Sequence, residues 1–189
     1  MVLEKASILF IATEAFDPSD GEKWLSYCQW AKIPGLTEIV SLDCMLCRHL
    51  VHDADERLNE DWEHIVCENF RLDYFYDLDY LLQRVQNVKR RNILGLYRNS
   101  DVHIPSPPAG RDFIFMGYDL IEEETQISAL NNCGGFSDVF ANSKLNSYGL
   151  ITDFGRAAEI RRLLVQYHPD EHHAHCELYA IWRLNESRE

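Results

Sequence analysis

The segment 174–184, near the end of the chain, constrains the fold more than any other part of the sequence. Its apolar side chains recur at every second position, and one side of it carries Cys176, Leu178, Ala180, Trp182 and Leu184. A period of two residues is typical of a β-strand, because successive side chains of a strand point to opposite faces. A strand in this position, after several earlier strands and helices, disfavours a sheet that is wholly parallel.

Upstream of this segment, apolar residues predict a series of strands and helices. Strands are expected at 6–13, 36–42, 92–98 and 113–121, and helices at about 20–33, 77–90 and 152–167, with a further helix capped by Asn59. The first helix places Trp24, Tyr27 and Ala31 on one face, which is the spacing of an amphipathic helix. Segment 99–111 holds three prolines and a glycine, and it is expected to be an exposed loop that offers a contact surface or a lid.

This order of elements predicts a fold of the α+β class, with a mixed sheet of about five strands and helices packed on it. The chain has 189 residues, of which 46% are hydrophobic. That is enough for one well-buried core, whereas two complete domains would each be small. We therefore expect residues 1–189 to form a single globular domain.

The chain is strongly acidic, because 31 acidic residues outnumber 18 basic ones and give a formal net charge of -13. Such a charge argues against a protein whose main task is to hold nucleic acid phosphates or an anionic membrane surface. It suits a basic protein as partner. Solubility alone is the simpler explanation of the same charge.

The sequence also lacks the hydrophobic segments that direct a protein into or across a membrane. No stretch approaches the roughly 18 apolar residues of a membrane span, and the apolar run 6–12 is too short and too acidic at its flanks for a signal peptide. We therefore expect a cytoplasmic protein in which the six cysteines are reduced thiols.

Two thiols and two imidazoles lie close together in the run 43–52, where Cys44 and Cys47 are followed by His49 and His52. These are the usual ligands of zinc. Structural zinc sites normally separate their two ligand pairs by a dozen or more residues, so that the chain can surround the ion, whereas a single residue separates the pairs here. A metal site at Cys44, Cys47, His49 and His52 would therefore need help from the histidines at 172, 173 and 175.

The same cysteines suggest redox chemistry as an alternative. A strand, helix and strand followed by Cys-x-x-Cys is the context of a thioredoxin-like motif. The residues between the thiols, Met45 and Leu46, are not the Gly-Pro typical of that motif, and no later strand begins with a suitable proline. Packing at the end of a strand is the remaining interpretation of Cys44 and Cys47.

A thiol nucleophile is a third hypothesis, and it rests on Cys133, which two glycines follow. Glycines beside a thiol let the backbone turn tightly and expose amide donors to a developing oxyanion. His173, or a neighbouring histidine, would act as the base. The same four residues, Asn-Cys-Gly-Gly, are also typical of a plain tight turn.

Taken together, the sequence favours a soluble acidic protein-binding domain of the inhibitor, antitoxin-like or regulatory kind. The aromatic and acidic run 73–77 is a candidate contact surface, because aromatic residues supply much of the energy of interfaces. The alternatives are an enzyme that uses a cysteine and a histidine, as a thiol hydrolase or a thiol redox protein, and a metal-binding protein. The sequence leaves open whether the protein is an enzyme and which cofactor, if any, it holds.

Overall fold

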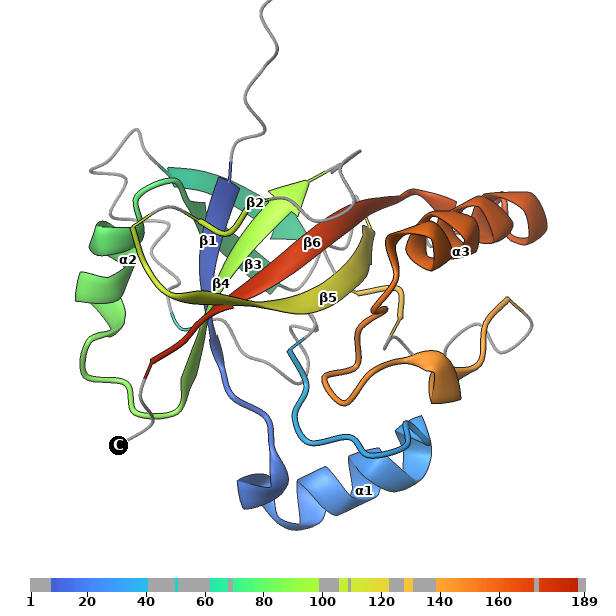
Figure 1. Ribbon diagram of the computed structural model, residues 1–189, viewed down its shortest axis with the longest axis horizontal. Coiled ribbons are helices and arrows are strands. Elements are labelled where there is room, and N and C mark those ends of the chain that lie inside the picture. Colours follow the sequence, from blue (N-terminus) through green and yellow to red (C-terminus); the bar gives the residue numbers. More distant parts are fainter. Residues whose placement is uncertain are drawn as a thin grey trace, which may run out of the picture.

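A six-stranded antiparallel sheet forms the centre of the computed structural model (Figure 1). The structure describes residues 8–40, 50, 62–67, 70–98, 106–108, 110–122, 128–130, 139–171 and 174–186, with only the backbone at 62–67 and 70–73. The strands are β1 (Ile8–Glu14), β2 (Trp62–Cys67), β3 (Phe70–Phe75), β4 (Arg91–Arg98), β5 (Phe113–Glu122) and β6 (Cys176–Leu184). They lie side by side in the order β2-β3-β1-β4-β6-β5.

Helices lie around this sheet, and two of them begin after a capping aspartate. They are α1 (Glu22–Ala31), α2 (Leu78–Val85) and α3 (Phe154–Tyr167), together with the short 3₁₀ turns η1 (Pro18–Asp20) and η2 (Asn142–Lys144). The carboxylates of Asp77 and Asp153 cap α2 and α3 by accepting the backbone N–H of Tyr80 and Arg156. Such caps satisfy amide groups that the first turn of a helix leaves unpaired.

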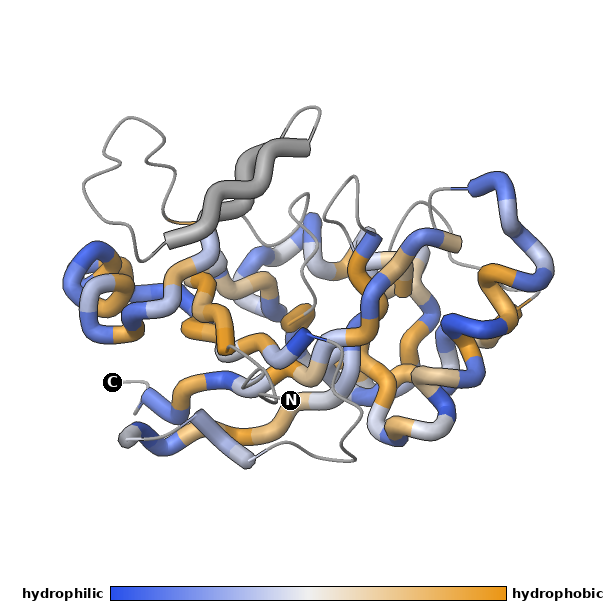
Figure 2. Tube along the Cα trace, turned by 90° about the horizontal axis from the view of Figure 1, so that it is seen from above, coloured by the Kyte–Doolittle hydropathy of each residue, from blue (hydrophilic) through white to orange (hydrophobic). Residues whose placement is uncertain are grey.

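Both faces of the central strands are buried, which explains why β1 is apolar without alternation. Leu9 and Ile11 pack on one face with Leu94, while Phe10 and Ala12 pack on the other. Alternate side chains of a strand point to opposite faces, so a strand covered on both sides has no polar side. Figure 2 shows hydrophobic residues concentrated in the middle of the molecule, while the outer turns are mainly hydrophilic.

The helices cover one face of the sheet from two directions. Leu81 and Val85 of α2 belong to a cluster with Phe10 and Trp182 of the sheet, and α1 and α3 belong to a second cluster around Tyr118. On the opposite face, loop residues such as Val40 and Leu150 take the place of helices. The sheet is therefore sandwiched between helices and irregular chain, and this irregular chain carries part of the site described below.

Gly117 marks an irregularity in β5 where no other residue fits well. The pairing of β5 with β6 shifts register between Phe115 and Gly117, and Gly117 has a φ of 141°. A Cβ atom added at Gly117 would lie 2.8 Å from the carbonyl oxygen of Ile151 and 2.9 Å from Cβ of Leu150. The bulge thus lets the segment around Leu150 approach the sheet backbone directly.

The α+β class and the packing of helices on the sheet are confirmed, but all of the described strand pairs are antiparallel rather than mixed. The strand predicted at 36–42 accounts for part of the difference. The described part of this segment, residues 36–40, forms a single antiparallel bridge between Phe16 and Ile39 instead of a strand of the sheet. The turn after α1 sends the chain across the end of the sheet, so its apolar residues are buried without joining a ladder.

The helix predicted after Asn59 is wrong over the residues that the structure describes. Residues 62–67 and 70–75 form the antiparallel hairpin of β2 and β3, in register from Trp62 opposite Phe75 to Cys67 opposite Phe70. Apolar residues with a helical spacing also carry β-branched and aromatic side chains here, which favour strands when a partner strand is present. Tertiary pairing therefore outweighs the local helical pattern.

In the described part of the segment between β4 and β5, Ser106, Pro107, Gly110 and Arg111 are exposed, as expected of a loop, and Pro108 is the exception. Pro108 is buried, and a Cβ atom added at Gly95 of β4 would lie 3.0 Å from its ring. Moreover, β6 lies between β4 and β5, so those two strands are not a hairpin. None of the helices in the described ranges is long and apolar enough to cross a membrane.

Candidate functional site

A polar cleft of about 1100 Å³ opens at one end of the sheet, between η1, the turn from α2 to β4, and the end of β6. We call it the polar cleft. It is lined by Ala15, Asp17, Ser19, Gln86, Asn87, Val88, Lys89, Arg90, Arg91, Asn92, Arg183, Leu184, Asn185 and Glu186. Its size is that of a ligand site or of a recess that takes a peptide segment.

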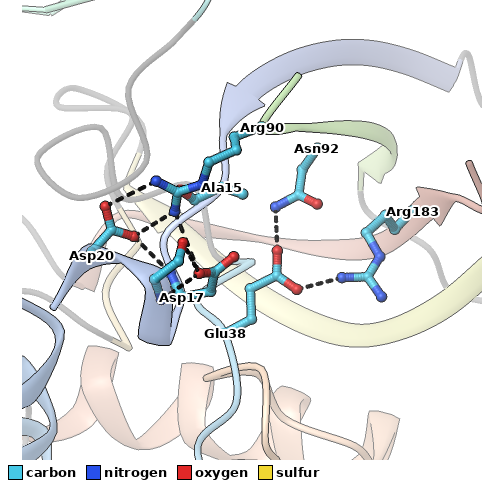
Figure 3. A network of polar contacts seen from close by, with 8 residues as sticks. Ala15, Asp17, Asp20, Glu38, Arg90, Asn92 and Arg183 are labelled. Carbon is cyan, nitrogen blue, oxygen red and sulfur yellow. Dashed lines mark hydrogen bonds and ion pairs between the residues drawn. The ribbon is translucent and has the colours of Figure 1, made fainter. Parts of the chain in front are cut away.

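The wall of the polar cleft is backed by a buried group of three polar residues, which we call the Glu38 cluster (Figure 3). Asn92 donates from Nδ2 to Oε1 of Glu38 at 2.8 Å, and Arg183 donates from Nη1 to Oε2 at 2.6 Å. Glu38 is 4% exposed and Asn92 is 2% exposed. A carboxylate buried to this extent is tolerated only where a charge and hydrogen bonds compensate for its lost hydration.

Three separate parts of the fold position the Glu38 cluster. Asn92 and Arg183 come from the adjacent strands β4 and β6, in which Arg183 pairs with Leu94. Glu38 comes from the irregular chain after α1, where Ile39 donates its N–H to the carbonyl of Phe16 at 3.0 Å. The guanidinium of Arg183 also lies 5.4 Å from the ring centre of Tyr148, so a cation–π contact holds it on its other side.

Asn92 retains an acceptor that no hydrogen bond uses. Its orientation is fixed because a carboxylate only accepts hydrogen bonds, so Nδ2 must face Glu38. Its Oδ1 atom is then buried with no hydrogen-bond partner in the part of the chain that the structure describes. Such an atom has lost its hydrogen bonds to water and has gained none from the described part of the protein. Asn92 is therefore the residue of this wall that can still accept a hydrogen bond.

A second set of ion pairs is centred on Arg90, which also lines the polar cleft (Figure 3). Arg90 donates from Nη2 to Oδ2 of Asp20 at 2.7 Å and to the carbonyl oxygen of Ala15 at 3.2 Å. Its Nη2 also lies 3.4 Å from Oδ1 of Asp17. Asp17 and Asp20 in turn form the capping box of η1, so the guanidinium is held in a fixed position.

These contacts shift the pKa values of the groups involved. The pKa of Asp20 lies below its ordinary value, chiefly because Arg90 hydrogen-bonds to it. For Asp17, burial is the largest influence and raises the pKa, but the hydrogen bonds from Ser19 and the charge of Arg90 outweigh it and lower the pKa overall. The hydrogen bond to Asp20 raises the pKa of Arg90. All three groups are therefore charged at neutral pH.

Replacing Asp20 with asparagine is expected to reduce the free energy of unfolding by about 1 kcal/mol at pH 7, because it removes an ion pair and part of a cap. The folded pKa of Asp20 is lowered, so its stabilisation is complete above the unfolded pKa and is lost as the pH falls through the folded pKa. Urea unfolding of both proteins between pH 7 and pH 2.5 should show the difference shrinking at the acidic end. A difference that grows with acid would contradict this assignment.

Arg91 ties the end of β6 to the turn after α2. It makes two parallel hydrogen bonds to the carboxylate of Glu186, from Nε at 3.0 Å and from Nη2 at 2.7 Å. Its Nη1 donates to the carbonyl oxygens of Val85 and Val88. A guanidinium held by a paired carboxylate and by carbonyls is rigid, so this wall of the polar cleft has a defined shape.

The lining of the polar cleft is more basic than the chain as a whole. It contains Lys89, Arg90, Arg91 and Arg183, against the carboxylates of Asp17 and Glu186. The chain carries a net charge of -13. Asp20 and Glu38 pair with Arg90 and Arg183 from behind this lining, so the recess as a whole is close to neutral and still departs from the acidic charge of the chain.

The residues that the sequence nominated for catalysis and metal binding lie outside the described residues. These are Cys133 and His173 for the thiol enzyme, and Cys44, Cys47, His49 and His52 for the metal site. Within the described ranges, no three histidine, cysteine or acidic residues are grouped so as to hold a metal ion. The metal and redox hypotheses stay predictions.

The described segments 128–130 and 174–184 both contact β5. Ser128 forms a bridge with Ile121 of β5, and Ile121 pairs with Glu177 near the start of β6. The nearby Cys176 is 2% exposed, and burial raises the pKa of its thiol to about 12. Cys176 is therefore a packing residue, while a role for Cys133 with a C-terminal histidine stays a prediction.

Searches with protein-family models, curated proteins and solved structures find no match to this chain. The chemistry of the polar cleft is therefore the basis for assigning a function. Sequence reasoning missed the cleft, although Glu38 and Asn92 are polar residues inside or beside apolar runs. A polar residue at a position where the pattern expects a buried one was the available signal.

Proposed function

We propose that the protein is a protein-binding domain of the inhibitor, antitoxin-like or regulatory kind, and that the polar cleft is its recognition site. The observation that carries this proposal is the Glu38 cluster, because the cleft is the accessible surface above it. A buried ion pair contributes little net stability compared with apolar residues of the same size. The Glu38 cluster at the wall of the polar cleft is therefore better explained by a role in binding a partner than by a role in stabilising the fold.

The arginines of the polar cleft support binding by a macromolecule. Arg90 is fixed by Asp17, Asp20 and Ala15, and Arg91 is fixed by Glu186. Arginine is enriched among the residues that dominate interface energies. A side chain that is already immobile loses little conformational entropy when a partner binds, so more of its interaction energy appears as affinity.

The charge of the chain supports a basic protein as partner. Residues 41–73 contain nine acidic and three basic side chains, so a large share of the acidic excess belongs to one stretch of sequence. Opposite net charges accelerate the encounter of two proteins and orient it. We propose that long-range attraction brings a basic partner to this protein, and that the polar cleft then fixes its position.

Site-specific photocrosslinking tests this function. The photoreactive amino acid p-benzoylphenylalanine replaces Gln86, which lines the polar cleft, or Gln83, which is exposed on the same helix but does not line it. We expect irradiation in native extract to attach a discrete protein at position 86 and not at position 83. The captured protein is identified by mass spectrometry, produced separately, and its Kd is measured by calorimetry at two salt concentrations.

The two positions form a matched pair, because both are glutamines of α2 or its cap and both are exposed. Equal labelling at positions 83 and 86, or no labelling at position 86 in any extract that contains the native protein, would refute the polar cleft as the recognition site. An affinity that does not fall with added salt would refute a basic partner.

A further inference from the structure

We propose that the polar cleft binds the terminal carboxylate of a partner chain, with that residue's own backbone N–H donated to Asn92. This inference rests on the proposed protein-binding function and specifies the group that is recognised. Capture of a chain terminus by fixed donors and acceptors is a known mode of peptide recognition.

The acceptor is Oδ1 of Asn92. It is buried without a hydrogen-bond partner, and the bond from Nδ2 to Glu38 prevents the amide from turning over. The residue lines the polar cleft and is 2% exposed. An oxygen in this position requires an N–H or O–H donor, and leaving it unpaired costs about 1–3 kcal/mol. An occupant of the cleft therefore gains most if it brings a donor.

The donors for an anion are Arg183 and Lys89. Within the described residues, the hydrogen bond of Arg183 to Glu38 engages Nη1 and leaves the rest of the guanidinium available. Lys89 is exposed and forms no ion pair with another described residue. A guanidinium binds a carboxylate through two parallel hydrogen bonds, and a lysine adds a point charge.

The spacing of these groups favours a chain terminus over an acidic side chain. Asn92 and Arg183 bond to the two oxygens of the same Glu38 carboxyl group, so they lie side by side (Figure 3). In a C-terminal residue the N–H nitrogen and the carboxylate carbon are both bonded to Cα and lie about 2.5 Å apart. In aspartate or glutamate the side-chain carboxylate is farther from the backbone N–H.

A terminal carboxylate also reconciles the basic lining of the polar cleft with a basic partner. Lys89 forms no ion pair with another described residue, and Arg183 keeps donors that Glu38 does not use, so an acidic group complements these two cations. Every protein chain ends in a carboxylate whatever its net charge. A partner that is basic overall can thus satisfy both the acidic surface of this protein and the cations of the cleft.

Three acetylated peptides of similar length and charge test this inference with the full chain. The first is Lys-Gly-Lys-Gly-Leu with a free carboxylate, the second is the same peptide as its C-terminal amide, and the third is Lys-Gly-Asp-Gly-Lys as its amide. Binding is followed by NMR, through the side-chain amide signals of Asn92 and the Nε–H signal of Arg183. We expect the free acid to shift both signals and to bind about tenfold more tightly than either amide, because it alone offers the carboxylate beside an N–H.

Two exposed lysines provide the matched variants. Lys89→Glu should weaken binding of the free acid by about fivefold or more, because it replaces a favourable charge with an unfavourable one. Lys144→Glu makes the same charge change outside the polar cleft and should leave the Kd within about twofold, because only distant screened charge changes. Both lysines are exposed, so both variants should fold.

Each outcome decides the inference. Equal binding of the free acid and its amide, or tighter binding of the internal aspartate peptide, would overturn it. So would shifts at α3 without shifts at Asn92. If a protein is crosslinked at position 86 but the free acid is not preferred, the proposed protein-binding function still holds and only the terminal carboxylate is rejected. Selective binding of the free acid with no protein captured at position 86 would support the carboxylate site and reject the partner.

Discussion

Replacement of Glu38 by alanine is expected to lower the free energy of unfolding by about 3–5 kcal/mol. Glu38 is 4% exposed, and its two oxygens accept from Arg183 and Asn92. Without the carboxylate, a largely buried guanidinium has no counter-charge and Nδ2 of Asn92 has no acceptor. Urea unfolding followed by circular dichroism measures the loss.

The exposed ion pair of Arg156 and Glu159 on α3 provides the control. Their side chains are 38% and 48% exposed, so Glu159→Ala should cost at most about 1 kcal/mol. The double replacement of Glu38 and Arg183 by methionine should recover part of the stability lost in Glu38→Ala, because it removes the unpaired guanidinium, while Nδ2 of Asn92 still lacks its acceptor. If Glu38→Ala costs no more than Glu159→Ala, the Glu38 cluster is not the buried site that we describe.

The same double variant separates stability from recognition. If the Glu38 cluster serves binding, the variant with methionine at both positions should fold and yet fail to bind the partner captured at position 86. A variant that folds and binds with unchanged Kd would show that the cluster is only structural. The free energy of unfolding and the Kd for the partner are therefore both measured on the same variant, by urea unfolding and by calorimetry.

Replacement of Gly117 by alanine is the second change with a large expected effect, about 3 kcal/mol or more. Its φ of 141° strains any residue with a side chain, and the added Cβ would lie 2.8 Å from the carbonyl oxygen of Ile151. A backbone oxygen cannot move aside as a flexible side chain can. Thermal unfolding should show a clear fall in Tm.

Gly35 is the matched position for this test. It also has a positive φ, 66°, but an added Cβ there would meet no atom within 4 Å. Gly35→Ala should therefore cost only about 1–2 kcal/mol, the price of the left-handed conformation. Equal losses at positions 35 and 117 would mean that the close approach of Ile151 to the bulge contributes nothing.

The spacing of apolar residues along the sequence was enough to predict the strands and helices in which the residues that repeat with the period of that element are the buried ones. The strands at β1 and β6 and the helix at α3 lie within one or two residues of their predicted bounds. The buried face of α1, formed by Trp24, Tyr27 and Ala31, is also as predicted. In each case the side chains that repeat in sequence are the ones that meet the core.

Elements that depend on distant pairing could not be predicted in this way. The hairpin of β2 and β3 has apolar residues at a helical spacing, and only the neighbouring strands decide its conformation. Ile39 and Val40 pack on the sheet, although the described residues 36–40 join no ladder. Periodicity reports burial, and burial alone does not distinguish a strand from irregular chain.

The residues of the proposed binding site could not be predicted from neighbouring residues in the sequence, for the same reason. Glu38 lies 54 residues from Asn92 and 145 residues from Arg183 in sequence, so no short motif contains them. The sequence directed attention instead to cysteines and histidines, whose chemistry is recognisable residue by residue. Carboxylates, amides and guanidiniums gain a specific meaning only when the fold buries them together.

The position of β6 has a consequence for how the protein is made. Although β6 is the last strand in sequence, it occupies an interior place in the sheet, between β4 and β5. A growing polypeptide therefore cannot complete the sheet until residue 184 has left the ribosome, and β5 has no partner strand to complete its ladder before then. Pairings across such long separations form slowly, which leaves apolar strand edges open during synthesis. We expect the nascent chain to need protection by chaperones until residues 176–184 have emerged.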